Sequence, residues 1–195
     1  MAAQAQLSAQ MSIQEYLAFE EKSTVKHELA AGQIFAMAGA SERHNRIAMN
    51  VAGHLHQATR RSECTTFISD MRVKIDQVIY YPDVMVACEA SDTHPYLKTA
   101  PCLIVEVLSP ETERIDRGEK LYNYRQIAEL KAYVLISQNE VRVDFYRRFE
   151  PQWLFESYAS LGDAVRLDCP ETELSLAEIY ERIEFVNTET QLQSS

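Results

Sequence analysis

The order of sequence patterns predicts a single α/β sandwich domain with a mixed β-sheet. A helical pattern comes first, followed by several strand patterns, a further helical pattern and more strands, as expected when helices cover the faces of a sheet. The chain of 195 residues, 46% of them hydrophobic and 25% charged, is long enough for one substantial core. We expect the domain to span residues 12–186, with flexible tails at residues 1–11 and 187–195.

The N-terminal third contains two predicted helices with a hairpin between them. Ser12 and Glu15 match a capping box, which begins a helix that continues to about Lys22. The segment KHELAAGQIFAM has two short extended pieces around Ala31 and Gly32, as in a β-hairpin. From residue 41 to about residue 60, one face of a helix is indicated by side chains at three- and four-residue steps: His44, Ile47, Ala48, Val51, Ala52 and Leu55.

The rest of the chain is predicted to be mostly strand. Residues 72–76 alternate between apolar and charged side chains, as in a half-buried strand, and a turn near Gln77 leads to the next strand. A polar loop at 89–100 precedes a strand at 102–108 and a helix from about residue 111 to 128. The segments AYVLIS, VRVDFYRR and QWLFESY predict three further strands. Ser175 and Glu178 form a second capping box, which begins a short helix.

Composition and charge limit the classes of function. The net charge of -10 argues against a large basic face for nucleic-acid phosphates, although a local basic cleft is compatible with it. The cysteines at positions 64, 88, 102 and 169 are widely spaced, so we expect them to be reduced and mostly buried, without disulfides or a zinc site. No segment approaches the roughly 20 apolar residues of a membrane span. We therefore expect a cytoplasmic protein without membrane association.

An acidic residue, Glu106, interrupts the most apolar predicted strand. Residues two apart share a face of a strand, so Glu106 lies beside Ile104 and Leu108. Both faces of this strand are apolar, which predicts a central position in the sheet. An unpaired carboxylate there would cost on the order of several kcal/mol. The compensating cation is either a buried Lys or Arg in a structural ion pair or a divalent metal.

A second acidic residue, Asp83, follows Pro82 at the start of another predicted strand. Taken alone, a Pro-Asp pair is typical of turn chemistry. The 23-residue separation between Asp83 and Glu106 allows a strand, a loop and a return on the neighbouring strand. Two adjacent carboxylates repel each other unless a cation lies between them, and Mg²⁺ suits that position because it binds a few carboxylate oxygens and keeps waters.

Several segments carry a resemblance to a known family. In this order, YYPDVMV, PCLIVEVLSPET, DRGEKLYNY and AYVLIS resemble the Uma-two family of proposed restriction endonucleases, which is grouped with the PD-(D/E)XK nucleases. The segment HELAAGQIFAMAGASERHNRIAMNVAGHL also resembles the start of that family. The resemblance covers roughly residues 12–185. It implies a restriction-endonuclease-like core, in which helices flank a central mixed β-sheet after an N-terminal helix and hairpin.

The resemblance also implies catalytic roles. Asp83 would be the aspartate of the PD element and Glu106 the acidic residue of the (D/E)-x-K element, and both would ligate Mg²⁺ or Mn²⁺. The lysine of that element is missing, because the position two beyond Glu106 holds Leu108. Lys120 is the expected substitute, donated from the following helix.

The position of Lys120 can be examined from its helical spacing. It shares a stripe with Asp116, Tyr124 and Ile127, so it faces the sheet if Ile127 does. Two interpretations follow. Lys120 is either only the counter-charge of Glu106, or a catalytic group that positions water or stabilises charge on the phosphate.

Three further residues are auxiliary candidates. Glu28 and His44 belong to the hairpin and the first long helix, which can flank the active site in this fold. Alternatively, His44 satisfies helix amides or fills the edge of the core. Tyr124 is expected to pack with its hydroxyl near the site. His54 and His56 are two apart on a helix and cannot face the same way, so they build no zinc site.

The predicted activity is metal-assisted hydrolysis of DNA phosphodiesters by an endonuclease. Basic residues that could contact DNA are concentrated in one part of the sequence: Arg43, Arg46, Arg60, Arg61, Arg72 and Lys74. A homodimer is expected, because cutting two strands favours two sites. The rival hypothesis is a catalytically inactive binding or assembly module of the same fold, with Glu106 and Lys120 as a buried structural ion pair.

Overall fold

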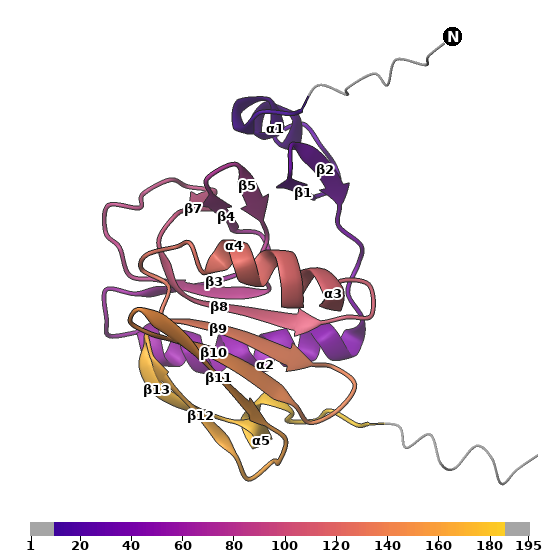
Figure 1. Cartoon of the computed structure of the whole chain (residues 1–195). Helices are drawn as coiled ribbons and strands as arrows, with labels where there is room; N and C mark the ends of the chain where they lie inside the picture. The colour runs from indigo at the N-terminus through magenta and orange to yellow at the C-terminus, as the bar shows by residue number, and fades with distance from the viewer. Residues whose placement is uncertain (1–9, 186–195) are drawn as a thin grey trace, which may run out of the picture.

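The computed structural model describes residues 10–185 as a mixed α/β protein with two mixed sheets, a separate hairpin and few helices (Figure 1). The predicted C-terminal tail and residues 1–9 lie outside the described residues. The Met11 amide donates a hydrogen bond to the Gly32 carbonyl at 2.8 Å. No described helix is both long and apolar enough to cross a bilayer.

The larger sheet has six strands in the order β11-β10-β9-β8-β6-β3. Strands β8 and β9 are parallel, and the other neighbours are antiparallel. The strands are β3 (Thr65–Ile68), β6 (Val84–Ala87), β8 (Pro101–Leu108), β9 (Ala132–Ser137), β10 (Val143–Phe149) and β11 (Gln152–Tyr158). All eight residues of β8 are buried, which confirms the predicted central strand.

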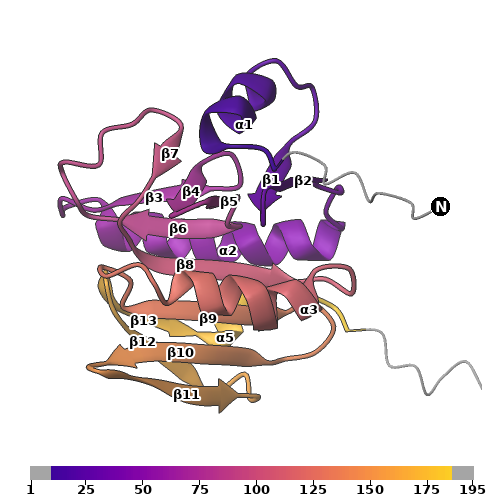
Figure 2. The ribbon, with the colours of Figure 1, turned by 45° about the horizontal axis from the view of Figure 1, so that its top comes forward.

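Helices cover both faces of this sheet (Figure 2). On one face lies α2 (Glu42–Thr59), whose Ile47, Val51 and Leu55 are fully buried in the core, as their spacing predicts. On the other face lies a helical segment made of α3 (Glu113–Ile115), the π-helix η1 (Asp116–Lys120) and α4 (Leu121–Tyr124). The two apolar layers hold β8 between them.

A second sheet was not predicted as a separate unit. Its order is β2-β1-β5-β4-β7, with β4 and β7 parallel. The strands are β1 (His27–Ala30), β2 (Gln33–Ala36), β4 (Arg72–Ile75), β5 (Val78–Tyr80) and β7 (Leu97–Lys98). The last of these lies in the segment predicted as a loop. The predicted central mixed sheet is present, but the sequence did not reveal this second sheet, which forms because the N-terminal hairpin pairs with β5 instead of the six-stranded sheet.

Helix α1 (Ile13–Glu20) packs on this second sheet. The capping box predicted from Ser12 and Glu15 is present. The buried residue of the helix, Tyr16, contacts Leu29 and Ile79 in a small core of its own. Glu28 thus lies on β1, between β2 and β5 in the second sheet.

The C-terminal region adds a hairpin that the sequence did not reveal. Strands β12 (Ala164–Asp168) and β13 (Glu171–Ser175) pair antiparallel, and the predicted capping box begins α5 (Leu176–Ile179). Val165, Leu167 and Leu174 complete the core on the α2 face of the six-stranded sheet. The hairpin therefore packs against the same apolar core as α2.

The expectation of four reduced cysteines is wrong. Cys64 forms a disulfide with Cys88, and Cys102 forms one with Cys169. Strands β3 and β6 pair Thr65 with Ala87, which places Cys64 opposite Cys88 although 24 residues separate them. Sequence spacing alone does not reveal such a pairing, because it depends on strand register.

Candidate active site

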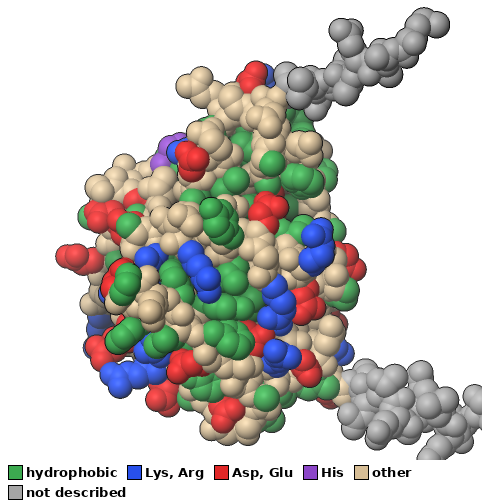
Figure 3. All heavy atoms as spheres, in the orientation of Figure 1, with side chains coloured by type: hydrophobic (Ala, Val, Ile, Leu, Met, Phe, Trp, Pro, Cys, Tyr) green, Lys and Arg blue, Asp and Glu red, His purple; other side chains and the backbone are tan. Residues whose placement is uncertain are grey.

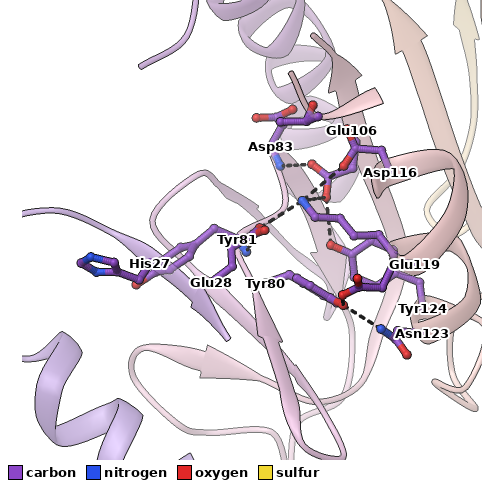
Figure 4. A network of polar contacts seen from close by, with 12 residues as sticks. His27, Glu28, Tyr80, Tyr81, Asp83, Glu106, Asp116, Glu119, Asn123 and Tyr124 are labelled. Atoms are coloured by element: carbon purple, nitrogen blue, oxygen red, sulfur yellow. Dashed lines mark hydrogen bonds and ion pairs between the residues drawn. The ribbon is translucent and has the colours of Figure 1, made fainter. Parts of the chain in front are cut away.

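Four carboxylates and one ammonium group converge between the two sheets, near the C-terminal end of β8. Figure 4 shows Glu28, Glu106 and Asp116 approaching one another from different elements. Glu106 comes from β8, Glu28 from β1, and both Asp116 and Lys120 come from η1. The fourth carboxylate, Asp83, directly precedes β6.

Strand pairing brings Asp83 and Glu106 together. Strands β6 and β8 are antiparallel, with Val84 opposite Val105. The Asp83 amide donates a hydrogen bond to Glu106 Oε2 at 3.1 Å, and the Val107 amide donates one to Asp83 Oδ2 at 2.7 Å. Each carboxylate is thus held by a backbone amide of the other strand. The predicted adjacency of the two acids is present in the structure.

The helical stripe predicted to face the sheet does so. Asp116, Lys120, Tyr124 and Ile127 are all buried. The Tyr124 hydroxyl donates a hydrogen bond to Glu106 Oε1 at 2.8 Å, and Lys120 Nζ donates to the same oxygen at 3.1 Å. The π-helical hydrogen bonding at residues 116–120 widens the helix where these groups are presented, a feature frequent at functional sites.

Lys120 is shared by three carboxylates. Its Nζ lies 3.0 Å from Glu28, 3.1 Å from Glu106 and 3.3 Å from Asp116. Burial alone would lower the pKa of Lys120, but the negative charges of these neighbours raise it well above its ordinary value. The side chain is therefore a permanent ammonium ion in the site.

For two of the carboxyl groups, Glu106 and Asp116, burial outweighs the attraction of Lys120. Burial raises the pKa of Glu106 well above its ordinary value, and the charges of Asp116, Asp83 and Glu28 add to the effect, against the lowering effect of Lys120. The pKa of Asp116 is also raised, again chiefly by burial. Asp116 Oδ1 is buried, lies outside hydrogen-bond geometry toward Lys120, and finds no partner among the described residues.

His44 lies at the solvent edge of the cluster. It stands in the first turn of α2, and its Nε2 is 3.2 Å from Asp83 Oδ2. Burial would lower the pKa of His44, but the hydrogen bond and charge of Asp83 raise it. The side chains of His44, Asp83 and Glu28 are 12%, 18% and 16% exposed, whereas that of Glu106 is 4% exposed. The accessible rim of the site is therefore formed by these three residues.

The six catalytic and auxiliary candidates of the sequence all lie in this cluster: Asp83, Glu106, Lys120, Glu28, His44 and Tyr124. Sequence reasoning missed two further residues of the site, Asp116 and Tyr80. Asp116 was recognised only as part of the stripe, although an acid one helical turn before a buried lysine was an available signal. A second shell links Tyr80 to Glu119 at 2.8 Å and to Asn123 at 2.6 Å. No local pattern marks Tyr80, because its contact with the helix arises only from the packing of the two sheets.

The charge balance and the donor set fit a divalent cation. Four carboxyl groups lie around one ammonium group, Lys120, with the His44 ring beside Asp83, and one buried carboxylate oxygen of Asp116 is without a hydrogen bond. Asp83 and Glu106 provide two adjoining carboxylates, not a closed cage of ligands. Mg²⁺ binds in this way, through one or two carboxylates and several waters. Leu108 is buried in the apolar layer and supplies no polar group.

The basic residues proposed for DNA contact do not gather at one place. Of these residues, Arg72 lies about 6 Å from the Tyr81 ring, next to the site, and Arg43 is beside His44 on α2. The C-terminal end of α2, followed by Arg60 and Arg61, is roughly 24 Å from His44 at 1.5 Å per residue. On the face shown in Figure 3, basic and acidic side chains are interspersed.

A family model and two relatives are similar to most of this chain. The Uma2 model, described as "Putative restriction endonuclease", matches residues 13–178. Two uncharacterised proteins of Synechocystis sp. (strain ATCC 27184 / PCC 6803 / Kazusa) are similar. One, slr1290, is 36% identical over 86% of this chain and 88% of its own length; the other, sll1609, is 39% identical over 72% and 82%.

One solved structure shares the fold. It is described as a putative nuclease belonging to DUF820 from Anabaena variabilis ATCC 29413, and it superposes with a TM-score of 0.75 at 17% sequence identity. The match covers 89% of this chain and 99% of that one. At this identity the similarity concerns the fold alone.

Proposed function

Because the chain belongs to the Uma2 family, we propose that it is a divalent-metal-dependent endonuclease that hydrolyses DNA phosphodiesters. The observation that carries this proposal is the crowding of four carboxyl groups around one ammonium group, Lys120. Four carboxylates are unfavourable together in a low-dielectric site unless protons or a further cation compensate them, and the pKa values of Glu106 and Asp116 are raised accordingly. A purely structural ion pair needs no such crowding.

In this mechanism Asp83 and Glu106 hold the ion, which is Mg²⁺ or Mn²⁺. When bound, the ion supplies Lewis-acid polarisation of the phosphate and an acidified water. The backbone amides of Asp83 and Val107 fix the two carboxylates, and Tyr124 fixes Glu106 from the opposite side. These hydrogen bonds to the two carboxylates would hold the donor oxygens in place during the reaction.

Lys120 has a positioning role in the resting site and a stabilising role in the reaction. Its ammonium group forms ion pairs with Glu28, Glu106 and Asp116. In the reaction, Lys120 would donate a hydrogen bond to a phosphate oxygen, on which negative charge develops. His44, held by Asp83 at the accessible rim, is placed to exchange a proton with the attacking water or the leaving group.

The partners follow from the same proposal. Arg72 lies beside Tyr81, whose backbone amide donates a hydrogen bond to Glu28, and would contact DNA phosphates. The restriction-endonuclease-like core, the homodimer that cuts two strands, and a cytoplasmic location also belong to this proposal.

One specific observation favours the rival, a catalytically inactive binding or assembly module. Both oxygens of Glu106 already accept hydrogen bonds, from the Asp83 amide, Lys120 and Tyr124. A structural pair would be satisfied in this way. Under the rival, removing the Glu106 charge destabilises the fold and metal binding is absent.

The test is calorimetric titration of Mg²⁺ and Mn²⁺ into the wild type and into Asp83→Ala and Glu106→Gln, with Glu171→Gln on the exposed surface of β13 as the matched control. We expect binding in the wild type and the control only. A cleavage assay on single- and double-stranded DNA should then show a loss of at least about 100-fold in Lys120→Ala. Failure of the wild type to bind either ion at millimolar concentration would exclude the proposal.

A further inference from the structure

All four cysteines of the chain meet at one point of the fold. They come from four different segments: Cys64 precedes β3, Cys88 follows β6, Cys102 lies in β8, and Cys169 follows β12. The two disulfides that they form are in contact with each other. Cys88 Sγ lies 3.5 Å from Cys102 Sγ and 3.3 Å from Cys169 Sγ.

This contact makes the sulfurs a single centre instead of two independent cross-links. The ligand atoms of Cys64, Cys88 and Cys169 all lie within 4.8 Å of one another. Those of Cys88, Cys102 and Cys169 do so as well. Cys102 is bonded to Cys169 and touches Cys88. Cys102 and Cys169 are buried, and Cys64 and Cys88 are partly buried against the same core.

We propose that this four-cysteine centre binds one Zn²⁺ ion when reduced and closes into two disulfides when oxidised. Reduction of each disulfide takes two electrons and two protons from a dithiol reductant, which becomes a disulfide itself. The S–S bond breaks and two thiols form. Each thiol that binds Zn²⁺ then releases its proton and ligates as a thiolate.

The spacing of the sulfurs suits this ion. A Zn–S bond of about 2.3 Å in a tetrahedron sets neighbouring sulfurs roughly 3.8 Å apart. The contacts between the two disulfides, 3.3 and 3.5 Å, are close to this edge length. Once the bonds within each pair are broken, van der Waals repulsion moves those sulfurs to a similar separation. Thiolate ligands favour Zn²⁺ over the hard ions that suit carboxylates.

The centre would fasten the same strands in either redox state. It joins the ends of β6 and β8 to β3 and to the β12–β13 hairpin. Asp83 and Cys88 lie at opposite ends of β6, five residues or roughly 16 Å apart at about 3.3 Å per residue. The ion bound by the cysteines is therefore distinct from the one proposed at the carboxylates, and the inference does not depend on nuclease activity.

The experiment uses Co²⁺ as a spectroscopic probe of the full chain. The protein is reduced with a phosphine, freed of reductant under nitrogen and titrated with Co²⁺. We expect sulfur-to-cobalt charge transfer and intense tetrahedral d–d absorption that saturate at one ion per chain and disappear when Zn²⁺ is added. The oxidised protein should give neither band.

Variants and a protection assay locate the ion. Cys64→Ser and Cys169→Ser should each weaken Co²⁺ binding by about 100-fold or more, whereas the control Asp83→Asn should retain the charge-transfer band. Zn²⁺ should also protect the wild-type thiols from alkylation, a readout that requires no variant to fold. Absence of charge transfer in the reduced wild type, or equal alkylation with and without Zn²⁺, would overturn the proposal and leave a centre that only forms disulfides.

Discussion

At the scale of single residues, two equally buried aspartates have opposite surroundings. Asp116 is 2% exposed, lies among other carboxylates and leaves one oxygen without a hydrogen bond. Asp144 is 1% exposed and accepts hydrogen bonds from Arg117, Arg142 and Ser157. The charge of Asp116 therefore opposes folding, whereas the charge of Asp144 supports it. An Asp→Asn substitution at each position measures this difference.

We expect Asp116→Asn to raise the free energy of unfolding by about 1 kcal/mol at neutral pH without metal, because it removes repulsion from the site. Asp144→Asn should lower it by about 2 kcal/mol, less than for a fully buried pair because Arg142 is half-exposed. Urea denaturation of both variants measures the difference. A loss of stability in Asp116→Asn comparable to that in Asp144→Asn would contradict the assignment of Asp116 to a strained site.

The pH dependence of stability should also differ between the two positions. The folded-state pKa of Asp116 is raised by burial. Its stabilising contribution to the free energy of unfolding is therefore fully present below the unfolded pKa of about 3.9, and it is lost as pH rises through the folded pKa. Burial alone would raise the pKa of Asp144, but Ser157 and the two arginines lower it. Its contribution is present above about 3.9 and is lost as pH falls through the folded pKa.

Unfolding curves at a series of pH values test these signs. The difference in stability between wild type and Asp144→Asn should shrink on acidification. The difference between wild type and Asp116→Asn should shrink as well. In this case the variant is the more stable protein at neutral pH, and the wild type becomes as stable when Asp116 is protonated. Parallel curves for the two variants would show that the two environments are equivalent.

At the scale of elements, two glycines distinguish a turn that needs glycine from a helix that does not. Gly32 ends the turn between β1 and β2 with φ of 74°, and a Cβ there would lie 2.5 Å from Gln10 Cβ. Gly118 lies inside η1, has no positive φ, and a Cβ there would meet nothing within 4 Å. Only the first position is restricted by geometry.

Gly32→Ala should therefore lower the free energy of unfolding by about 1–2 kcal/mol, and Gly118→Ala should raise it by about 0.5–1 kcal/mol. Because the hairpin carries Glu28, only Gly32→Ala should also weaken metal binding. Thermal melting with and without Mg²⁺ checks both parts. Destabilisation by Gly118→Ala would mean that the π-helical turn itself requires glycine.

Most elements were predictable because their signals are local. Capping boxes at Ser12 and Ser175 and the apolar stripe of α2 are written in a few neighbouring residues. The strand β7 and the β12–β13 hairpin were missed, since β7 is two residues long and the hairpin packs by tertiary contacts. The division into two sheets was not predictable, because it depends on which strands pair across long loops.

The candidate site was predictable in part for the same reason. The face shared by Ile104, Glu106 and Leu108 follows from strand periodicity, and the stripe of Lys120 follows from helical periodicity. The meeting of Glu28 with Lys120 and the second shell around Tyr80 required the docking of one sheet on the other. The pairing of the cysteines required the register of β3 against β6.

At the scale of the whole molecule, binding of a divalent cation should stabilise the native state by mass action. A ligand at about 100 times its dissociation constant adds roughly 2.7 kcal/mol to the free energy of unfolding. We expect Mg²⁺ to raise the melting temperature of the wild type and to leave that of Asp83→Ala unchanged. A similar rise in both proteins would place the stabilising ion somewhere other than the carboxylate cluster.

The cluster draws its residues from two sheets, and these sheets are not equally anchored. Glu28 belongs to the N-terminal hairpin, which joins its own sheet through a single β1–β5 residue pair, Leu29 with Ile79. Glu106 belongs to a strand buried on both faces. The hairpin can therefore detach as a cooperative unit while the larger core stays folded. On heating, the carboxylate cluster should lose Mg²⁺ binding at a temperature below that of global denaturation, and cooling should restore the binding without refolding of the core.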